Sequence, residues 1–115
     1  MHEFSIMTYL LDAVEEQAVQ LGARRVLAIN LLLGERSGID DSLLFYFDQL
    51  TPGTVAEGSH LNIRRTAMRF HCERCAGDYA PAPKRADFGC PQCGTVGQLV
   101  DDASELLIES LEIET

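Results

Sequence analysis

The sequence predicts an α+β fold in which two helices pack on a small three-stranded mixed sheet, with a cysteine-rich module inserted between two of the strands. Three observations lead to this prediction: helical periodicity near the start, aliphatic runs typical of strands, and four cysteines that precede the last strand. The order is helix, strand, helix, strand, cysteine module, strand. A chain of 115 residues is long enough for one domain with a small satellite.

The first helix and the first strand are predicted by two different apolar patterns. One helical face has apolar residues every three or four positions: Phe4, Met7, Leu11, Val14, Ala18 and Leu21. Gly22 predicts the helix end, because glycine adopts the left-handed conformation that often follows a last turn. The aliphatic run Val26 to Leu33 is too short for a buried helix and is closed by Gly34, so it predicts a strand covered on at least one face.

A second helix is predicted after the loop 37–41, which ends in an aspartate pair, Asp40 and Asp41, suited to a helix N-cap. Its buried stripe comprises Leu43, Phe47 and Leu50, and the helix is predicted to stop near Thr51-Pro52-Gly53.

The remaining strands flank the cysteines. Leu61 to Phe70 begins with alternation and predicts a half-exposed strand that leads into the first cysteine pair. Leu106 to Ile113 predicts the last strand, with glutamates on its solvated face. We therefore expect a main domain made of residues 1–69 and 100–115, and an inserted domain made of residues 70–99.

The cysteines form two C-x-x-C pairs, Cys72 with Cys75 and Cys90 with Cys93. This spacing brings four thiolates to one tetrahedral ion and is typical of a zinc-ribbon-like module with structural Zn²⁺. A rubredoxin-like iron centre uses the same ligands and remains an alternative. A thioredoxin-type dithiol needs a single pair in a βαβ setting, which this sequence lacks.

The net charge of −9, with only nine Lys and Arg residues, argues against nucleic acid as a partner. Arg64, Arg65, Arg69, Arg74, Lys84 and Arg85 could form a local basic patch around the cysteine pairs or could be solubilising charge. No run of about 20 apolar residues and no signal peptide is present, so we expect no membrane association and a cytoplasmic location. Catalytic nucleophile, phosphate-loop and H-E-x-x-H patterns are absent, which argues against an enzyme.

The chain start, Met1-His2-Glu3, offers a second kind of metal site. An α-amine, the amide nitrogen of residue 2 and the imidazole of His2 can place three nitrogens in one plane around an ion. Planar nitrogen ligands suit Ni(II) or Cu(II) better than zinc. The alternative is an idle N-terminus on a plain zinc-binding interaction module.

Several segments together resemble the HypA/HybF family of hydrogenase-maturation nickel-insertion proteins across essentially the full chain. They are Met1-His2-Glu3 with Ser5, Gly34, the segments 45–48 and 51–58, the two cysteine pairs, and 105–112. The resemblance implies a nickel-binding domain, a zinc domain inserted before the last strand, and no enzymatic activity. It also implies that Ni²⁺ is cargo held through His2, with backbone nitrogens of Met1, His2 and Glu3 as candidate ligands.

The same resemblance implies two partners, a HypB-type GTPase and the [NiFe]-hydrogenase large subunit that receives nickel. Either a monomer or a homodimer is compatible with the sequence. Some family members bring a further histidine to nickel, and here only His60 and His71 are available.

Overall fold

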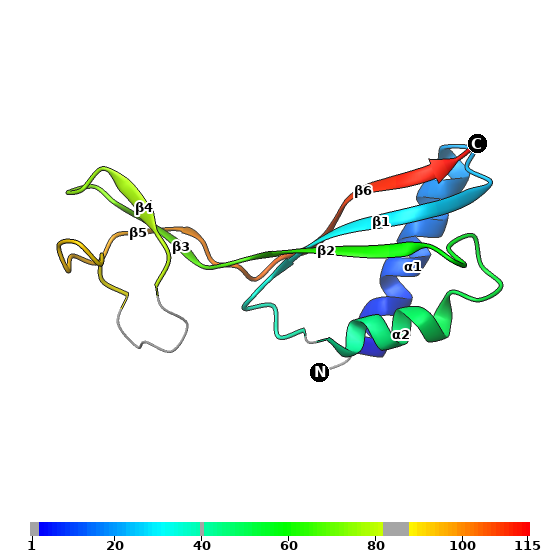
Figure 1. Ribbon diagram of the computed structural model, residues 1–115, viewed down its shortest axis with the longest axis horizontal. Helices are drawn as coiled ribbons and strands as arrows, with labels where there is room; N and C mark the ends of the chain where they lie inside the picture. Colours follow the sequence, from blue (N-terminus) through cyan, green and yellow to red (C-terminus); the bar gives the residue numbers. More distant parts are fainter. Residues whose placement is uncertain (1–2, 40, 82–87) are drawn as a thin grey trace.

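The computed structural model describes residues 3–39, 41–81 and 88–115. The molecule is elongated, with principal dimensions of 54 × 27 × 17 Å, and carries two three-stranded sheets at opposite ends of its long axis (Figure 1). Two helices accompany the first sheet, and the four cysteines accompany the second. The predicted α+β class, with a small mixed sheet and an inserted cysteine module, is confirmed.

The first sheet has the strand order β2-β1-β6. Its central strand is β1 (Arg25–Gly34), which pairs in parallel with β2 (His60–Thr66) and antiparallel with β6 (Leu106–Glu114). A continuous aliphatic run suits the centre of a sheet, because both of its edges are paired and one of its faces is buried.

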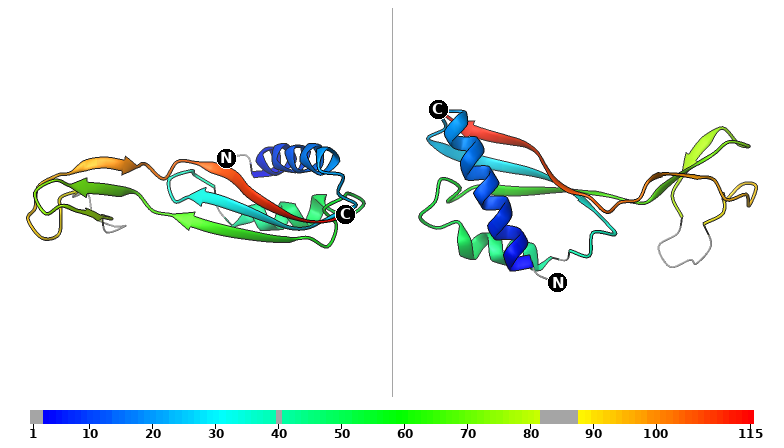
Figure 2. Two further views of the ribbon diagram at one scale, coloured as in Figure 1. Left: turned by 90° about the horizontal axis from the view of Figure 1, so that it is seen from above. Right: turned by 180° about the vertical axis from the view of Figure 1, so that it is seen from behind.

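Both helices, α1 (Glu3–Gln20) and α2 (Ser42–Leu50), lie on the same side of this sheet (Figure 2). The core combines three groups of side chains: Met7, Leu10, Val14 and Ala18 of α1, Leu43 and Phe47 of α2, and Val26, Ile29 and Leu31 of β1. Burying each large aliphatic side chain contributes roughly 1.5–3 kcal/mol to stability. Neither helix is long and apolar enough to cross a membrane.

The predicted apolar face of α1 is partly wrong at its ends. Phe4 and Leu21 are 52% and 56% exposed, and Leu10 is more deeply buried than Leu11. Leu21 lies beyond the last helical residue, in the turn at Gly22, while the Phe4 ring packs edge-on against Tyr46 with centroids 5.7 Å apart.

Both predicted helix termini lie where the sequence predicts them, although the second lacks a side-chain cap. Gly22 adopts a φ of +67°, and the N–H of Ala23 donates to the carbonyl of Ala18 at 2.9 Å, so the predicted C-terminal cap is confirmed. Asp41 is the N-cap residue of α2, as predicted, but its side chain makes no capping hydrogen bond; its carboxylate instead accepts a hydrogen bond from Arg65 at 2.8 Å. Asp40 lies outside the described residues.

The predicted strand from Leu61 to Phe70 is partly wrong: most of it is extended, but the chain leaves the first sheet in the middle of it. Strand β2 ends at Thr66, and β3 (Arg69–Cys72) belongs to the second sheet. Between them the N–H of Met68 donates to the Glu35 carboxylate at 2.9 Å rather than to a neighbouring strand. This side-chain acceptor is distant in sequence, so local alternation could not reveal it.

The second sheet has the order β4-β3-β5, in which β3 pairs antiparallel with both β4 (Gly77–Tyr79) and β5 (Gln98–Asp101). The Phe70 ring stacks on Tyr79 and Phe88, with centroids 5.6 and 5.7 Å apart. The Tyr79 hydroxyl donates to the Phe88 carbonyl and accepts from the Gly97 N–H. These contacts give the module a small core of its own.

We define the junction as residues 34–36, 66–68 and 101–105, where the two sheets are joined. Three backbone hydrogen bonds of 2.8 Å link it: from Gly34 N–H to Glu105, from Glu35 N–H to Thr66, and from Arg36 N–H to Ala103. Gly34 is packed directly against the carbonyl of Ala103, with no room for a β-carbon. The end of β1 is therefore hydrogen-bonded to both chain segments that connect the first sheet to the module.

On the sheet, Arg64 forms a two-point ion pair with Glu109, through hydrogen bonds of 3.0 and 2.7 Å. The hydrogen bond from Arg64 lowers the pKa of Glu109 below its ordinary value of 4.5. We expect Arg64→Met to return this pKa to the ordinary range, as followed by NMR titration of the Glu109 carboxyl carbon. The depressed pKa stabilises the fold above pH 4.5 and loses this effect as acid protonates Glu109. Equal titration curves for Glu109 in both proteins would contradict this prediction.

Candidate metal centre

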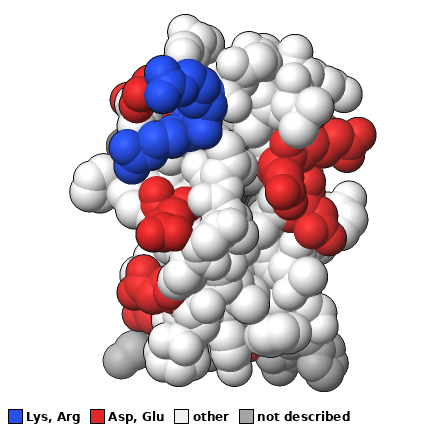
Figure 3. All heavy atoms as spheres, turned by 90° about the vertical axis from the view of Figure 1, so that its right-hand side faces the viewer, with Lys and Arg blue, Asp and Glu red and all other residues white. Residues whose placement is uncertain are grey.

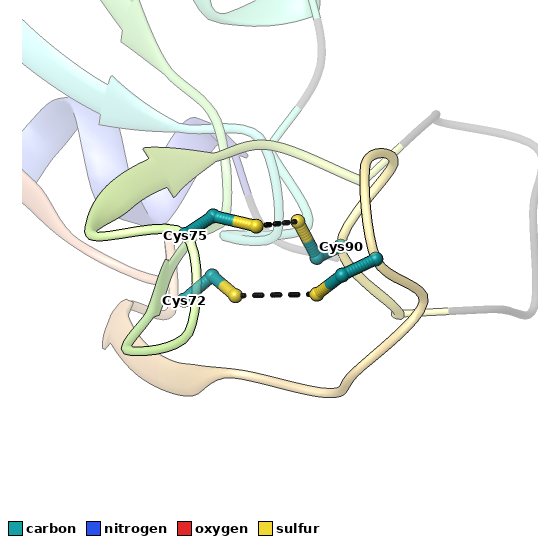
Figure 4. A group of neighbouring side chains, drawn as sticks. Cys72, Cys75 and Cys90 are labelled. Atoms are coloured by element: carbon teal, nitrogen blue, oxygen red, sulfur yellow. Dashed lines mark hydrogen bonds between the residues drawn. The ribbon is translucent and has the colours of Figure 1, made fainter.

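The four cysteines come from two turns of the second sheet, which face each other (Figure 4). Cys72 is the last residue of β3, and Cys75 follows in the turn to β4. In the second turn, Cys90 N–H donates to Thr95 at 2.9 Å and Gly94 N–H donates to Cys90 at 2.8 Å. Gly94 adopts a φ of +76°, which explains why glycine follows the last cysteine.

The sulfur positions fit one tetrahedral ion. All four Sγ atoms lie within 4.8 Å of one another, with 3.6 Å between Cys72 and Cys93 and 3.9 Å between Cys75 and Cys90. Zinc–sulfur bonds of about 2.3 Å place the sulfurs of a tetrahedral site about 3.8 Å apart. A disulfide would need about 2.05 Å, and all four thiols are free.

Electrostatics inside the cluster favour a bound cation. The side-chain hydroxyl and then the backbone N–H of Thr95 lower the pKa of Cys93 to about 6. The pKa of Cys75 is raised to about 12, mainly because its thiol hydrogen-bonds to Cys93. Thiols this close cannot all ionise by themselves, whereas a divalent cation would hold all four as thiolates.

Burial differs between the four candidate ligands. Cys72 and Cys90 are buried, Cys93 is half-buried and Cys75 is exposed. Four sulfurs complete a tetrahedral coordination shell and leave no position for water or a substrate, which is the arrangement of a structural site.

The histidines do not join this cluster. His71 precedes Cys72, but its Nδ1 lies 2.7 Å from the Asp78 carboxylate, which also receives Arg69 at 3.3 Å. His60 begins β2 in the other sheet. Among the residues that the structure describes, the four cysteines are the only group of three or more candidate metal ligands.

The possible basic patch around the cysteine pairs is not formed by Arg64 and Arg65. Both residues lie in β2 of the first sheet, where they pair with Glu109 and Asp41. Arg69 pairs with Asp78, which leaves Arg74 as the arginine of this group without an ion pair among the described residues. Lys84 and Arg85 lie outside the described residues.

Comparison with known proteins assigns the family. Residues 1–113 match the family model described as hydrogenase/urease nickel incorporation, metallochaperone, hypA. The chain belongs to the HypA family. Hydrogenase maturation factor HypA of Caldanaerobacter subterraneus subsp. tengcongensis is 37% identical, over 99% of this chain and 100% of that protein. Hydrogenase maturation factor HypA of Geobacter sulfurreducens is 39% identical, with the same coverage of both chains.

Solved structures agree with this assignment at the level of the fold. A solution structure of a HypA protein has a TM-score of 0.66 and 25% identity, and covers 99% of this chain and 97% of its own. The solution structure of the Ni metallochaperone HypA from Helicobacter pylori has a TM-score of 0.64 and 24% identity, with coverage of 98% and 97%. The family is thus one of metallochaperones for nickel incorporation. The similar proteins from other organisms are named hydrogenase maturation factors.

The predicted nickel ligands are only partly within the described residues. Met1 and His2 lie outside them, while Glu3 is the first residue of α1 and is 8% exposed. Sequence reasoning brought the four cysteines together correctly but missed Thr95 and Asp78, which hydrogen-bond to Cys93 and His71. Thr95 lies two positions after Cys93, and this proximity was the only available signal.

Proposed function

We propose that the protein is a cytoplasmic nickel metallochaperone that binds Ni(II) and helps to insert it into the [NiFe]-hydrogenase large subunit. The observation that carries this proposal is membership of a family described as nickel-incorporation metallochaperones over residues 1–113. The main domain, residues 1–69 and 100–115, would bind nickel, and residues 70–99 would bind zinc. The protein would act without catalysis of its own, in concert with a HypB-type GTPase, as a monomer or a homodimer.

We place Ni(II) at His2, together with backbone nitrogens chosen from Met1, His2 and Glu3. The start of α1 at Glu3 supports this placement. The first four N–H groups of a helix have no intrahelical acceptor, so the Glu3 amide nitrogen is not committed to the helix. The Glu3 carboxylate adds negative charge beside the proposed ion, in the first turn where a helix favours an acidic side chain.

The two metal sites would have different tasks. A closed four-sulfur site holds its ion firmly and shapes the module, whereas a site at the end of a chain, with few ligands, can release its ion. The proposed cargo is therefore nickel, and the proposed resident ion at Cys72, Cys75, Cys90 and Cys93 is Zn²⁺.

We expect His2→Ala to abolish tight Ni(II) binding without loss of zinc or of the fold. The reason is that the imidazole supplies the only side-chain nitrogen of the proposed planar ligand set. The measurement is calorimetric titration with Ni(II) of untagged, zinc-loaded protein that retains Met1, combined with metal analysis.

His60→Ala is the matched control, because His60 is an exposed histidine in β2 of the main domain. It should bind nickel as the parent protein does. Equal nickel binding by the parent and His2→Ala, or loss of zinc from His2→Ala, would overturn the proposed division between the two sites.

The identity of the resident ion is tested by colour. Ferric iron with four thiolates absorbs visible light, whereas zinc does not. We expect purified protein to be colourless with one equivalent of zinc. A red protein that contains iron would replace the structural zinc proposal with a rubredoxin-like centre.

A further inference from the structure

An arginine pair at the end of the first sheet is left unexplained by the proposed metal sites. Arg24 and Arg25 immediately precede and begin β1, and both are exposed. Arg64, Arg65 and Arg69 each have a carboxylate partner. Within the described part of the chain, no ion pair or side-chain hydrogen bond joins Arg24 or Arg25 to another residue. They are two of only nine Lys and Arg residues on a chain with a net charge of −9.

Both arginines line one hollow, together with Thr54, Val55, Glu57 and Gly58 of the turn that precedes β2. Figure 3 views this end of the molecule, where basic side chains gather in one place with acidic side chains around them. The start of β1 and the turn before β2, which line the hollow, lie at the end of the molecule opposite to the cysteine module (Figure 1).

The walls of the hollow are fixed by hydrogen bonds. The N–H of Val26 donates to Val55, and the hydroxyl of Ser59 donates to Val26, both at 2.9 Å. On the other side, the N–H of Arg24 donates to Glu114 of β6 at 2.7 Å. The backbone around the two arginines is therefore anchored to both neighbouring segments, so the two side chains start from fixed positions on the same hollow.

The nearby carboxylates do not satisfy these arginines. Glu57 lines the hollow, but it accepts a 2.6 Å hydrogen bond from the Gly53 N–H and so closes its own turn. Glu114 lies opposite Arg25 across the strands without forming an ion pair. The guanidinium donors remain available for an external acceptor.

We propose that this hollow docks a pair of carboxylates on an acidic segment of a partner protein. Each guanidinium offers a planar fork of donors that matches a carboxylate in two-point geometry. A long polyanion such as nucleic acid would extend past the two arginines over the acidic side chains around them and be repelled, whereas a short acidic segment meets the arginines first and the carboxylates more than about 8 Å away are screened at physiological salt. Of the carboxylates at the hollow itself, Glu57 is held by the Gly53 N–H. A partner held here would leave the cysteine module and the start of α1 accessible.

The test uses the full zinc-loaded chain and an acetylated, amidated peptide with the sequence Gly-Asp-Glu-Asp-Glu-Gly, followed by two-dimensional NMR of the backbone amides. We expect saturable shifts at Arg24, Arg25, Val55 and Gly58 that weaken as salt is raised. The variant Arg24→Gln/Arg25→Gln should lose at least about tenfold in peptide affinity, because hydrogen bonds to charged groups are lost.

Arg74→Gln is the matched control, since Arg74 is an exposed arginine in the cysteine module that has no ion pair with any other described residue. It should bind the peptide like the parent protein. The proposal is overturned if shifts do not saturate, if the double variant binds equally well, or if inorganic phosphate binds the hollow more tightly than the peptide. Ni(II) is absent from this experiment, so its result is independent of the proposed nickel site.

Discussion

Replacing Gly34 by alanine is expected to destabilise the protein by about 3 kcal/mol, the upper end of the usual cost of overpacking. A β-carbon at Gly34 would collide with the backbone carbonyl of Ala103, which cannot rotate away as a flexible side chain would. Ala103 is 1% exposed and accepts the hydrogen bond from Arg36. Relief of the collision would therefore displace the junction. Urea unfolding of the zinc-loaded protein, followed by circular dichroism, measures this effect.

Gly77→Ala is the control for the loss of a glycine as such. Gly77 lies in β4, is not in the left-handed region, and its added β-carbon would meet only one atom, at 4.0 Å. We expect it to change stability by less than about 0.5 kcal/mol. If Gly34→Ala unfolds at the same urea concentration as Gly77→Ala, the close packing at the junction does not contribute to the free energy of unfolding.

Cys90→Ser is expected to remove the structural metal and to unfold the inserted module while the first sheet stays folded. The binding free energy of structural zinc in small modules is roughly 10–16 kcal/mol at pH 7, most of which appears as folding free energy. Without it, the Phe70, Tyr79 and Phe88 stack is too small to hold the second sheet together. Amide NMR spectra should show a loss of chemical-shift dispersion for the residues of the module alone, and metal analysis should show that the metal is absent.

Cys75→Ser separates coordination from packing. Cys90 is 6% exposed, whereas Cys75 is exposed, so a packing effect would be confined to Cys90. If the thiolates act as ligands, both variants should lose the metal and unfold the module alike. A folded, metal-containing Cys75→Ser protein would show that the cluster does not depend on four sulfur ligands.

The sequence was most informative where short-range patterns determine structure. The spacing of the C-x-x-C pairs predicted a cluster whose sulfurs lie within 4.8 Å, because each turn has few alternatives. The run from Val26 to Leu33 predicted a covered strand, because an unbroken aliphatic segment needs burial. The role of His2 remains a prediction, since that residue lies outside the described part of the chain.

Long-range contacts account for what the sequence did not reveal. Strand β2 ends at Thr66, and just after it the N–H of Met68 donates a hydrogen bond to the carboxylate of Glu35, which is 33 positions away in the sequence. The Asp41 side chain pairs with Arg65 instead of capping α2. The hollow at Arg24 and Arg25 combines the start of β1 with the turn before β2. None of these contacts is accompanied by a local sequence pattern from which it could be predicted.

The position of the module between β2 and β6 has a consequence for the folding pathway. The side chains of Asn30 and Ser110, which hydrogen-bond across β1 and β6, are 80 positions apart, and closing so long a loop is entropically costly. In the folded module, Arg69 of β3 lies opposite Asp101 of β5 in the antiparallel strand pairing, which brings the two ends of the insertion together. A module that collapses early around its metal would shorten the effective loop and deliver β6 beside β1. We expect metal loading to accelerate closure of a sheet that contains none of the cysteines.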